Sequence, residues 1–286
     1  MYLYTGSGTR LNMATQSDLA NIDVSEKRIP WDTVIHRGWI SGAKENTLPA
    51  MYLVKEHGYN WAECDVRFSS EGVPVLAHNA TLVSEDSATT LTVASSTVEQ
   101  LKSIVLQTHA TFGEIRMPTL AEVLDMARLN NIGILIDFKA GNVENAKTVA
   151  EVVLSSGWSD HVVYMPMSVA NAQAIQTIDK NASFDFVSSV TAAGSLPDLA
   201  QYTALLTGAN TVGFDFEAAT TDANGGMDTA LYDAVRAAGL SISFWNVRSS
   251  AYKTYMDAGP LRITKQNTAD ALDLDTLYLE SKSWWQ

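Results

Sequence analysis

Short runs of apolar residues, many of them β-branched or aromatic, alternate with longer amphipathic runs along most of the chain. Short apolar runs bounded by turn-forming residues predict buried strands, whereas apolar residues spaced three and four positions apart predict helices. Regular alternation of the two predicts βαβ units and a parallel sheet. The predicted strands are residues 33–36, 61–66, 134–138, 162–165, 184–189, 211–216, 241–247 and 261–264.

The number of predicted strands defines the expected fold class. Eight parallel strands, each followed by a helix, predict an α/β protein of the (β/α)8 TIM-barrel type, a single domain that commonly uses about 250 residues. The chain has 286 residues, so we predict one barrel domain over residues 33–286. Residues 1–32 are polar and show no sustained period, which predicts an N-terminal arm or attachment segment.

Local signals mark where the predicted helices begin and end. Thr97 with Gln100 and Thr119 with Glu122 have capping-box spacing, in which the two side chains satisfy exposed backbone N–H groups at the start of a helix. Glycine is favoured just after a helix because the chain there often turns left-handed. The glycines that follow predicted helices are Gly58, Gly157, Gly208, Gly239 and Gly259.

The interval between the second and third predicted strands is unusually long. It contains an extended piece at residues 72–78, a stretch rich in Ser and Thr at residues 84–97, and two predicted helices. In a barrel, an insertion here lies on the face formed by the carboxyl ends of the strands, where active sites are built. We therefore predict an enlarged loop after strand two, close to the functional site.

Composition and charge exclude several function classes. The net charge of −13 disfavours binding to nucleic acid or to an anionic membrane, although a metal or local Arg and Lys residues can still attract a small anion. The single cysteine, Cys64, excludes an internal disulfide and a multi-cysteine zinc site. Neither a secretory signal nor an apolar run of about 18 residues is evident, so we expect a cytoplasmic or virion-associated protein without a membrane span.

Acidic residues gather at the predicted ends of two neighbouring strands. Glu63 and Asp65 are separated by one residue, so both point to the same face of a strand, and Cys64 points to the other. Asp137 stands near the end of the next strand. Burying like charges together is costly unless a cation or hydrogen bonds compensate them, so a divalent cation is expected here. The alternative is that these carboxylates are solvated or paired with arginine.

Two histidines flank the acidic residues along the chain. His36 and His78 each end an extended segment, and two imidazoles near neutral pH can both take and give a proton, as cleavage of a phosphodiester requires. Taken singly, each could be a structural histidine. Arg37 is suited to bidentate contact with phosphate, and Lys139 offers a second positive charge. Ion pairing is their other expected role, and the acids available for it are Glu45, Asp65 and Asp137.

Several short motifs occur in a fixed order along the chain. In order and spacing they resemble the glycerophosphodiester phosphodiesterase family over roughly residues 33–273. Each motif is weak by itself, and their order makes the resemblance specific. They are HRG (36–38), ENT (45–47), ECD (63–65), GVPVLAHNATL (72–82), MPTLAEVLD (117–125), IDFK (136–139), GLSISFWNV (239–247) and GPLRIT (259–264).

The resemblance implies a (β/α)8 barrel in which two histidines act as acid and base and carboxylates hold one divalent cation, Ca²⁺ or Mg²⁺. Three departures from the family pattern bear on the site: Asp137 replaces the usual Glu, Asn79 replaces the usual Asp, and residues 263–267 lack an Asp. Carried over by motif, His36 and His78 are catalytic, Glu63, Asp65 and Asp137 are metal ligands, and Arg37 and Lys139 bind phosphate with support from Glu45.

The expected reaction is metal-dependent hydrolysis of a glycerol-containing phosphodiester to a phosphomonoester and an alcohol. One histidine deprotonates the nucleophile, which is water or a neighbouring glycerol hydroxyl, and the other protonates the leaving oxygen. The sequence does not say which histidine is the acid. Trp245, at the end of the seventh strand, either packs on the substrate's alcohol part or fills the barrel.

The physiological substrate and partners stay open at this stage. A small diester of lipid metabolism such as glycerophosphocholine is one candidate. A glycerol-phosphate polymer, such as a teichoic acid or capsule, is another, and it would suit a module of a phage tail or another larger assembly. A non-catalytic barrel that binds a glycan or a partner protein is the alternative from a different class. A homo-oligomer is compatible with each of them.

Overall fold

The computed structural model describes residues 3–4, 10–11, 32–188, 196–217, 229–247 and 262–265. All eight predicted strands are present, and each is parallel to its neighbours in the ring. The ring closes because β15 pairs with β3, and β4 pairs with both β3 and β10. The strands are β3 (Asp32–Ile35), β4 (Trp61–Phe68), β10 (Gly133–Phe138), β11 (Val162–Met165), β12 (Ser183–Ser188), β13 (Thr211–Glu217), β14 (Ser241–Val247) and β15 (Arg262–Lys265).

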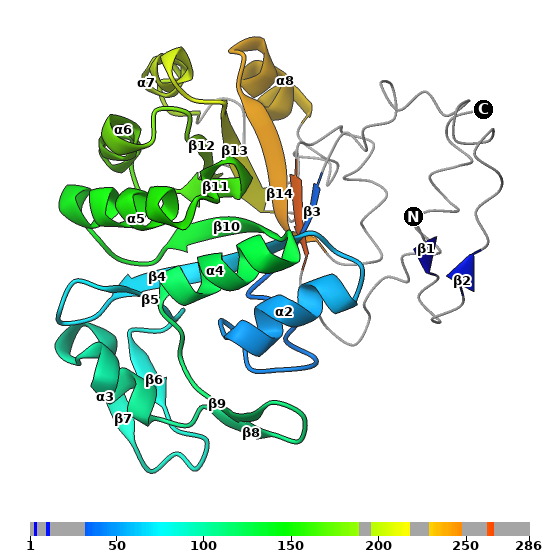
Figure 1. Cartoon of the computed structure of the whole chain (residues 1–286). Helices are drawn as coiled ribbons and strands as arrows, with labels where there is room; N and C mark the ends of the chain where they lie inside the picture. The colour runs from blue at the N-terminus through cyan, green and yellow to red at the C-terminus, as the bar shows by residue number, and fades with distance from the viewer. Residues whose placement is uncertain are drawn as a thin grey trace.

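Helices cover the outside of this ring (Figure 1), as the predicted (β/α)8 architecture requires. Both predicted capping boxes, at Thr97 and Thr119, are formed. The helices are α2 (Leu48–Glu56), α3 (Val98–Ser103), α4 (Leu120–Asn130), α5 (Val143–Ser156), α6 (Val169–Ile178), α7 (Ala200–Thr203) and α8 (Thr229–Ala237). Short 3-10 turns occur at η1 (Val93–Ser95), η2 (Ser159–His161) and η4 (Ala204–Thr207).

The glycines expected after helices divide into three groups. Gly58, Gly157 and Gly239 have positive φ, as predicted. The expectation for Gly208 is wrong, since its φ is −133° and it ends the 3-10 turn η4 without a left-handed residue. Gly259 lies outside the described residues. Helix α4 ends at Asn131, whose φ of 55° shows that asparagine takes the place of glycine there.

The inner and outer faces of the strands carry different side chains. Outward residues such as Ile136, Phe184 and Phe216 pack in the main core with apolar residues of the helices. Inward residues form a separate small core, in which Trp61 packs against Val34, Leu135, Val163 and Met165. Since Trp61 is the first residue of β4, this small core lies near the amino end of that strand, and inward side chains further along β4 approach the opposite face of the barrel.

The predicted enlarged loop after β4 is confirmed, and it contains more structure than the sequence indicated. Strand β5 (Pro74–Leu76) pairs antiparallel with β4. Two hairpins that were not predicted follow: β6 (Thr81–Val83) with β7 (Thr90–Thr92), and β8 (Gln107–His109) with β9 (Gly113–Ile115). Apolar residues of this segment form their own core, and Figure 1 shows the hairpins and α3 together at the lower edge of the barrel.

Little of the predicted N-terminal arm is described. Strand β1 (Leu3–Tyr4) pairs antiparallel with β2 (Arg10–Leu11), and the rest of residues 1–31 lies outside the described residues. The division into an arm and a barrel domain therefore stays a prediction. Among the helices that the structure describes, none has the length and apolar character to cross a bilayer.

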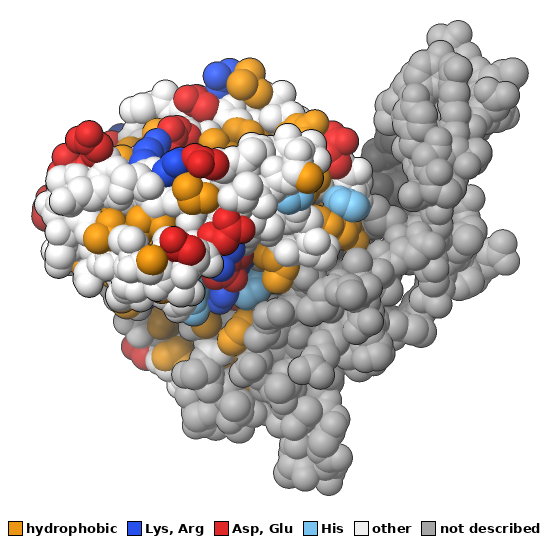
Figure 2. All heavy atoms as spheres, turned by 90° about the horizontal axis from the view of Figure 1, so that it is seen from below, with side chains coloured by type: hydrophobic (Ala, Val, Ile, Leu, Met, Phe, Trp, Pro, Cys, Tyr) orange, Lys and Arg blue, Asp and Glu red, His pale blue; other side chains and the backbone are white. Residues whose placement is uncertain are grey.

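Charged side chains are mixed on the molecular face seen in Figure 2. Lys and Arg side chains lie among Asp and Glu side chains there, and the coloured residues on that face form no broad basic patch. This mixture of charges is compatible with the net charge of −13.

Candidate active site

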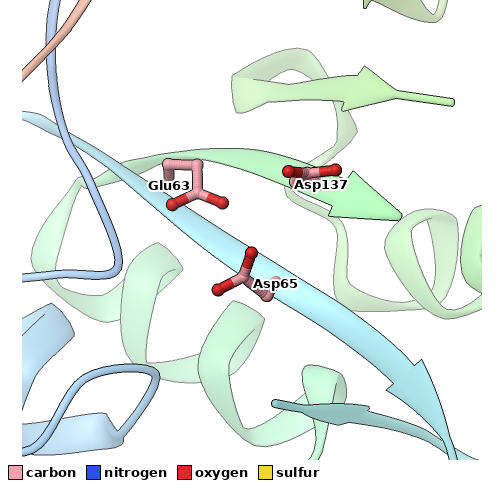
Figure 3. Close-up of side chains that lie close together, drawn as sticks. All are labelled: Glu63, Asp65 and Asp137. Atoms are coloured by element: carbon pink, nitrogen blue, oxygen red, sulfur yellow. The ribbon is translucent and has the colours of Figure 1, made fainter. Parts of the chain in front are cut away.

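Three carboxylates converge inside the barrel, as predicted (Figure 3). Glu63 and Asp65 extend from the same face of β4, and Asp137 lies directly beside Asp65 in the pairing of β10 with β4. One oxygen from each of the three lies within 4.8 Å of the others. The intervening Cys64 faces the opposite way and is buried in the main core, also as predicted. The alternating direction of side chains on a strand is therefore what assembles this cluster.

Asp65 is the most heavily supported of the three carboxylates. Its side chain is fully buried. Oδ2 accepts a hydrogen bond from Nδ2 of Asn46 at 2.6 Å and lies 3.1 Å from Nε of Arg37. Oδ1 lies 3.1 Å from Nζ of Lys139. The backbone N–H of Asp65 donates to Oδ1 of Asn46, so one asparagine binds this residue at two points.

Glu63 keeps one oxygen without a hydrogen bond. Its Oε2 accepts from the backbone N–H of Arg37 at 2.9 Å and lies 3.8 Å from Nε2 of His36. Its Oε1 is buried and has no hydrogen-bond partner among the described residues. A buried carboxylate oxygen without a partner is costly, so a ligand at this position would relieve an existing penalty.

The cluster fits a hard divalent cation. Three carboxylates are the ligand type that Ca²⁺ and Mg²⁺ prefer, and the unpartnered Oε1 of Glu63 gives the site a vacant acceptor. The ligand oxygens lie within 4.8 Å of one another, which does not exceed twice a Ca²⁺–oxygen distance of about 2.4 Å, so one ion can contact all three. The shorter side chain of Asp137 therefore does not keep its oxygen from the other two. The residues do not distinguish Ca²⁺ from Mg²⁺.

Cation binding at these carboxylates is expected to weaken as the pH falls. Burial, followed by the charge of Asp65, raises the pKa of Glu63 well above its usual range, and burial also raises the pKa of Asp137. Because the cation binds ionised carboxylates, protons compete with it at pH values where exposed carboxylates are already ionised. Calorimetric titration with Ca²⁺ from about pH 8 to about pH 5 should show this loss, and constant affinity over that range would contradict the ligand assignment.

His36 directly follows β3 and lies beside the acidic cluster. Burial lowers its pKa to about 4, and the positive charges of Arg37, Lys139 and His78 act in the same direction against the opposing effect of Asp65. The lowered pKa leaves the imidazole neutral near pH 7, so it can accept a proton. His78 contributes to this shift, so it lies within electrostatic reach of His36, and the joint catalytic role of the two histidines stays a prediction.

His78 follows β5 in the enlarged loop and is held by two neighbours. Its Nδ1 lies 3.2 Å from Oδ1 of Asn79, the residue that departs from the family pattern. Its backbone carbonyl accepts a hydrogen bond from Nε of Arg67 at 2.9 Å. An amide oxygen can only accept, so this contact favours a proton on Nδ1.

The turn after β3 requires its particular residues. Arg37 and Gly38 both have positive φ, of 56° and 78°. A Cβ atom at position 38 would lie 2.7 Å from the carbonyl carbon of Ala50, so only glycine fits there. The ENT segment then begins α2, with the side chain of Thr47 as its N-cap. The turn thereby fixes His36 and Arg37 relative to the start of the first helix.

Arg37 and Lys139 form the ion pairs that were expected as one of their two roles. Arg37 pairs with Glu45 through Nη1 at 3.1 Å as well as with Asp65. Lys139 pairs with Asp137 at 2.5 Å and with Asp65. Both cations therefore lie at the acidic cluster. Their contact with phosphate, and the supporting role of Glu45, stay predictions.

Trp245 lies on β14, apart from the cluster on β4 and β10. Its side chain is partly buried, and its indole Nε1–H is buried without a hydrogen-bond partner among the described residues. An acceptor on a substrate would satisfy this donor, which agrees with the predicted substrate contact. No described contact joins Trp245 to the acidic cluster, so its role also stays a prediction.

Two residues of the site were not assigned a role from the sequence. Asn46 was quoted in the ENT motif, but its bonds to Asp65 were not foreseen. Arg67 was not considered, although it follows Asp65 by two positions and so shares its strand face. That spacing was the available signal for Arg67. For Asn46 the signal was weaker: asparagine is enriched at left-handed positions, and its φ is 56°.

Replacing Asn46 by alanine is expected to destabilise the protein by about 2–4 kcal/mol, because it leaves buried groups of Asp65 unpaired and places alanine at positive φ. Asn131→Ala is the matched control, since Asn131 has nearly the same φ of 55° at the exposed end of α4. The free energy of unfolding of this control variant should fall by only about 1 kcal/mol. Urea unfolding measures both, and equal losses would contradict a role for the side chain of Asn46.

Comparison with known proteins agrees with this geometry. The sequence model of the glycerophosphoryl diester phosphodiesterase family matches residues 36–262. Rat glycerophosphodiester phosphodiesterase 1 is 31% identical over 122 residues, which are 41% of this chain and 37% of that protein. The human protein of the same name is 30% identical over 122 residues, with the same coverage. The chain thus covers little more than a third of the length of these curated relatives.

Solved structures share the fold across most of the chain. A glycerophosphodiester phosphodiesterase from Agrobacterium tumefaciens has a TM-score of 0.65 at 21% identity, covering 85% of this chain and 100% of that one. A phosphodiesterase from Oleispira antarctica, solved with its product sn-glycerol-3-phosphate, has a TM-score of 0.67 at 15% identity, covering 87% and 96%. With the family match over most of the barrel, the resemblance drawn from the motifs is confirmed: the chain belongs to the glycerophosphoryl diester phosphodiesterase family.

Proposed function

We propose that the chain hydrolyses a glycerol-containing phosphodiester to a phosphomonoester and an alcohol. The observation that carries the proposal is the convergence of Glu63, Asp65 and Asp137 within 4.8 Å, beside His36 and at the barrel face where such enzymes react. Membership of the family and the names of the matched relatives support the same reaction.

The positive charges of the site would bind the phosphoryl group. Glu63, Asp65 and Asp137 would hold one divalent cation, Ca²⁺ or Mg²⁺, which supplies charge stabilisation to the phosphoryl oxygens when bound. Arg37, oriented by Glu45 and Asp65, presents its guanidinium at the same place. A carboxylate that fixes the direction of an arginine reduces the entropy lost when that arginine binds phosphate.

The two histidines would transfer the protons. His36 is neutral near pH 7 and accepts the proton of the nucleophile, because its pKa is lowered to about 4. His78, when protonated on both ring nitrogens, donates the Nε2 proton to the leaving oxygen and keeps its Nδ1–H bonded to Asn79. The nucleophile is water, or the neighbouring glycerol hydroxyl, in which case a cyclic phosphate forms first.

Phosphorus NMR of the products tests the reaction and separates the substrate classes. Glycerophosphocholine and a glycerol-phosphate polymer are each incubated with the protein and Ca²⁺ or Mg²⁺. We expect the small diester to yield glycerol 3-phosphate, with a transient cyclic phosphate if the glycerol hydroxyl attacks. Turnover of the polymer alone would favour a depolymerase. Turnover of neither would contradict the proposed hydrolysis and favour a non-catalytic binding barrel.

A further inference from the structure

The ammonium group of Lys139 lies between two of the proposed cation ligands. Its Nζ is 2.5 Å from Oδ2 of Asp137 and 3.1 Å from Oδ1 of Asp65. The backbone N–H of Lys139 donates to the carbonyl of Val66, which fixes the residue beside β4. Without a divalent cation, Lys139 thus supplies positive charge to the two carboxylates.

The oxygen of Asp65 that Lys139 contacts is the one a cation would need. The other oxygen of Asp65, Oδ2, is already engaged by Asn46 and Arg37. Oδ1 is therefore the oxygen of Asp65 that is left for a cation, and it faces the ammonium. Two positive ions within a few ångströms of each other in a buried site repel strongly, so the ammonium and a divalent cation exclude each other at Oδ1 of Asp65.

We propose that Lys139 is the internal counter-cation of the metal-free site and leaves Asp65 and Asp137 when a divalent cation binds. The inference rests on the proposed cation site and adds that an internal ammonium sets its affinity. Apparent affinity falls in proportion to the fraction of molecules in which the carboxylates are released. Lys139 also becomes available to an anionic substrate only when the cation is present, which links the two binding events.

Calorimetric titration with Ca²⁺ tests the proposal without measuring turnover. Lys139→Met removes the competitor, so the apparent Kd should fall by about tenfold or more if the paired arrangement is favoured by at least about ten to one. The Tm without cation should fall by several degrees, because Asp65 and Asp137 lose their counter-charge. Lys139→Gln, which keeps a hydrogen-bond donor, should shift both quantities in the same directions and serves if the methionine variant does not fold.

Lys147→Met is the matched control for the loss of one positive charge. Lys147 lies on the outer helix α5, and its Nζ pairs with Oε1 of Glu144 at 2.9 Å. At about 0.15 M salt, its removal should change the Kd by less than about threefold. A similar gain in affinity in this variant would show that general charge, and not competition at shared oxygens, is responsible.

Two results would overturn the proposal. One is unchanged or weaker Ca²⁺ binding by both Lys139 variants, and the other is absence of Ca²⁺ binding by the wild type and the variants alike. The proposed hydrolysis stands or falls separately. A protein that shows this competition but cleaves no phosphodiester would contradict the proposed function and retain the role of Lys139.

Discussion

Replacing His36 or His78 by alanine is expected to lower kcat for glycerophosphocholine hydrolysis by about a hundred- to ten-thousand-fold. The reason is that each imidazole would transfer one of the two protons of the reaction, and general acid–base catalysis accelerates reactions by factors of this order. Because neither imidazole is a proposed ligand of the cation, Ca²⁺ affinity should change much less than kcat. Steady-state kinetics and calorimetric titration of the same variants measure the two effects.

His161→Ala is the control for this experiment. His161 is exposed in η2, stacks on Trp158 and precedes β11 at the amino end of that strand, away from the proposed catalytic face. Its loss should leave kcat within about twofold of the wild type, as is usual for surface substitutions. Retention of near-normal kcat by either His36→Ala or His78→Ala would remove that histidine from the mechanism.

Replacing Asp65 by asparagine is expected to lower kcat by a similar factor, because the variant binds the divalent cation more weakly. The substitution keeps the shape of the side chain but removes the central charge of a cluster in which Asp65 contacts Arg37, Lys139 and Asn46. In the wild type, Ca²⁺ at about 100 times its Kd should add about 2.7 kcal/mol of stability, which is a rise in Tm of about 5 °C. The variant should lose this rise together with most of its activity.

Asp125→Asn controls for the loss of an acidic residue in general. Asp125 lies on α4, is 66% exposed and pairs only loosely with Arg128, at 3.9 Å. Exposed pairs of this kind contribute little, so both activity and the Ca²⁺-dependent rise in Tm should persist. If Asp65→Asn also kept the full rise in Tm, the cation would have to bind elsewhere.

The sequence predicted the fold because its signals are local and repeated. Each of the eight strands is a short apolar run that alternates with an amphipathic run. This alternation identifies the fold even where the predicted end of a strand is wrong by one or two residues. The capping boxes at Thr97 and Thr119 were predictable for the same reason, since both partners lie within four residues. The hairpins β6–β7 and β8–β9 were missed because their strands have three residues each and are partly exposed, so no apolar run marks them.

The candidate site was predictable where strand geometry alone decides it. Glu63 and Asp65 share a face because side chains alternate along β4, and Asp137 joins them because parallel strands align their carboxyl ends. The bonds of Asn46 to Asp65 depend on how the loop after β3 folds back over β4, which no local pattern encodes. The ion pair of Lys139 with Asp137 follows from their spacing of two residues, whereas its contact with Asp65 depends on the pairing of β10 with β4.

Dependence of turnover on a divalent cation is the most direct test of the account. The wild-type protein is treated with chelator, assayed for release of glycerol 3-phosphate from glycerophosphocholine, and assayed again after Ca²⁺ or Mg²⁺ is added in excess. We predict that turnover disappears with chelator and returns with the cation. Undiminished turnover in chelator would contradict a cation held by Glu63, Asp65 and Asp137 as the basis of catalysis.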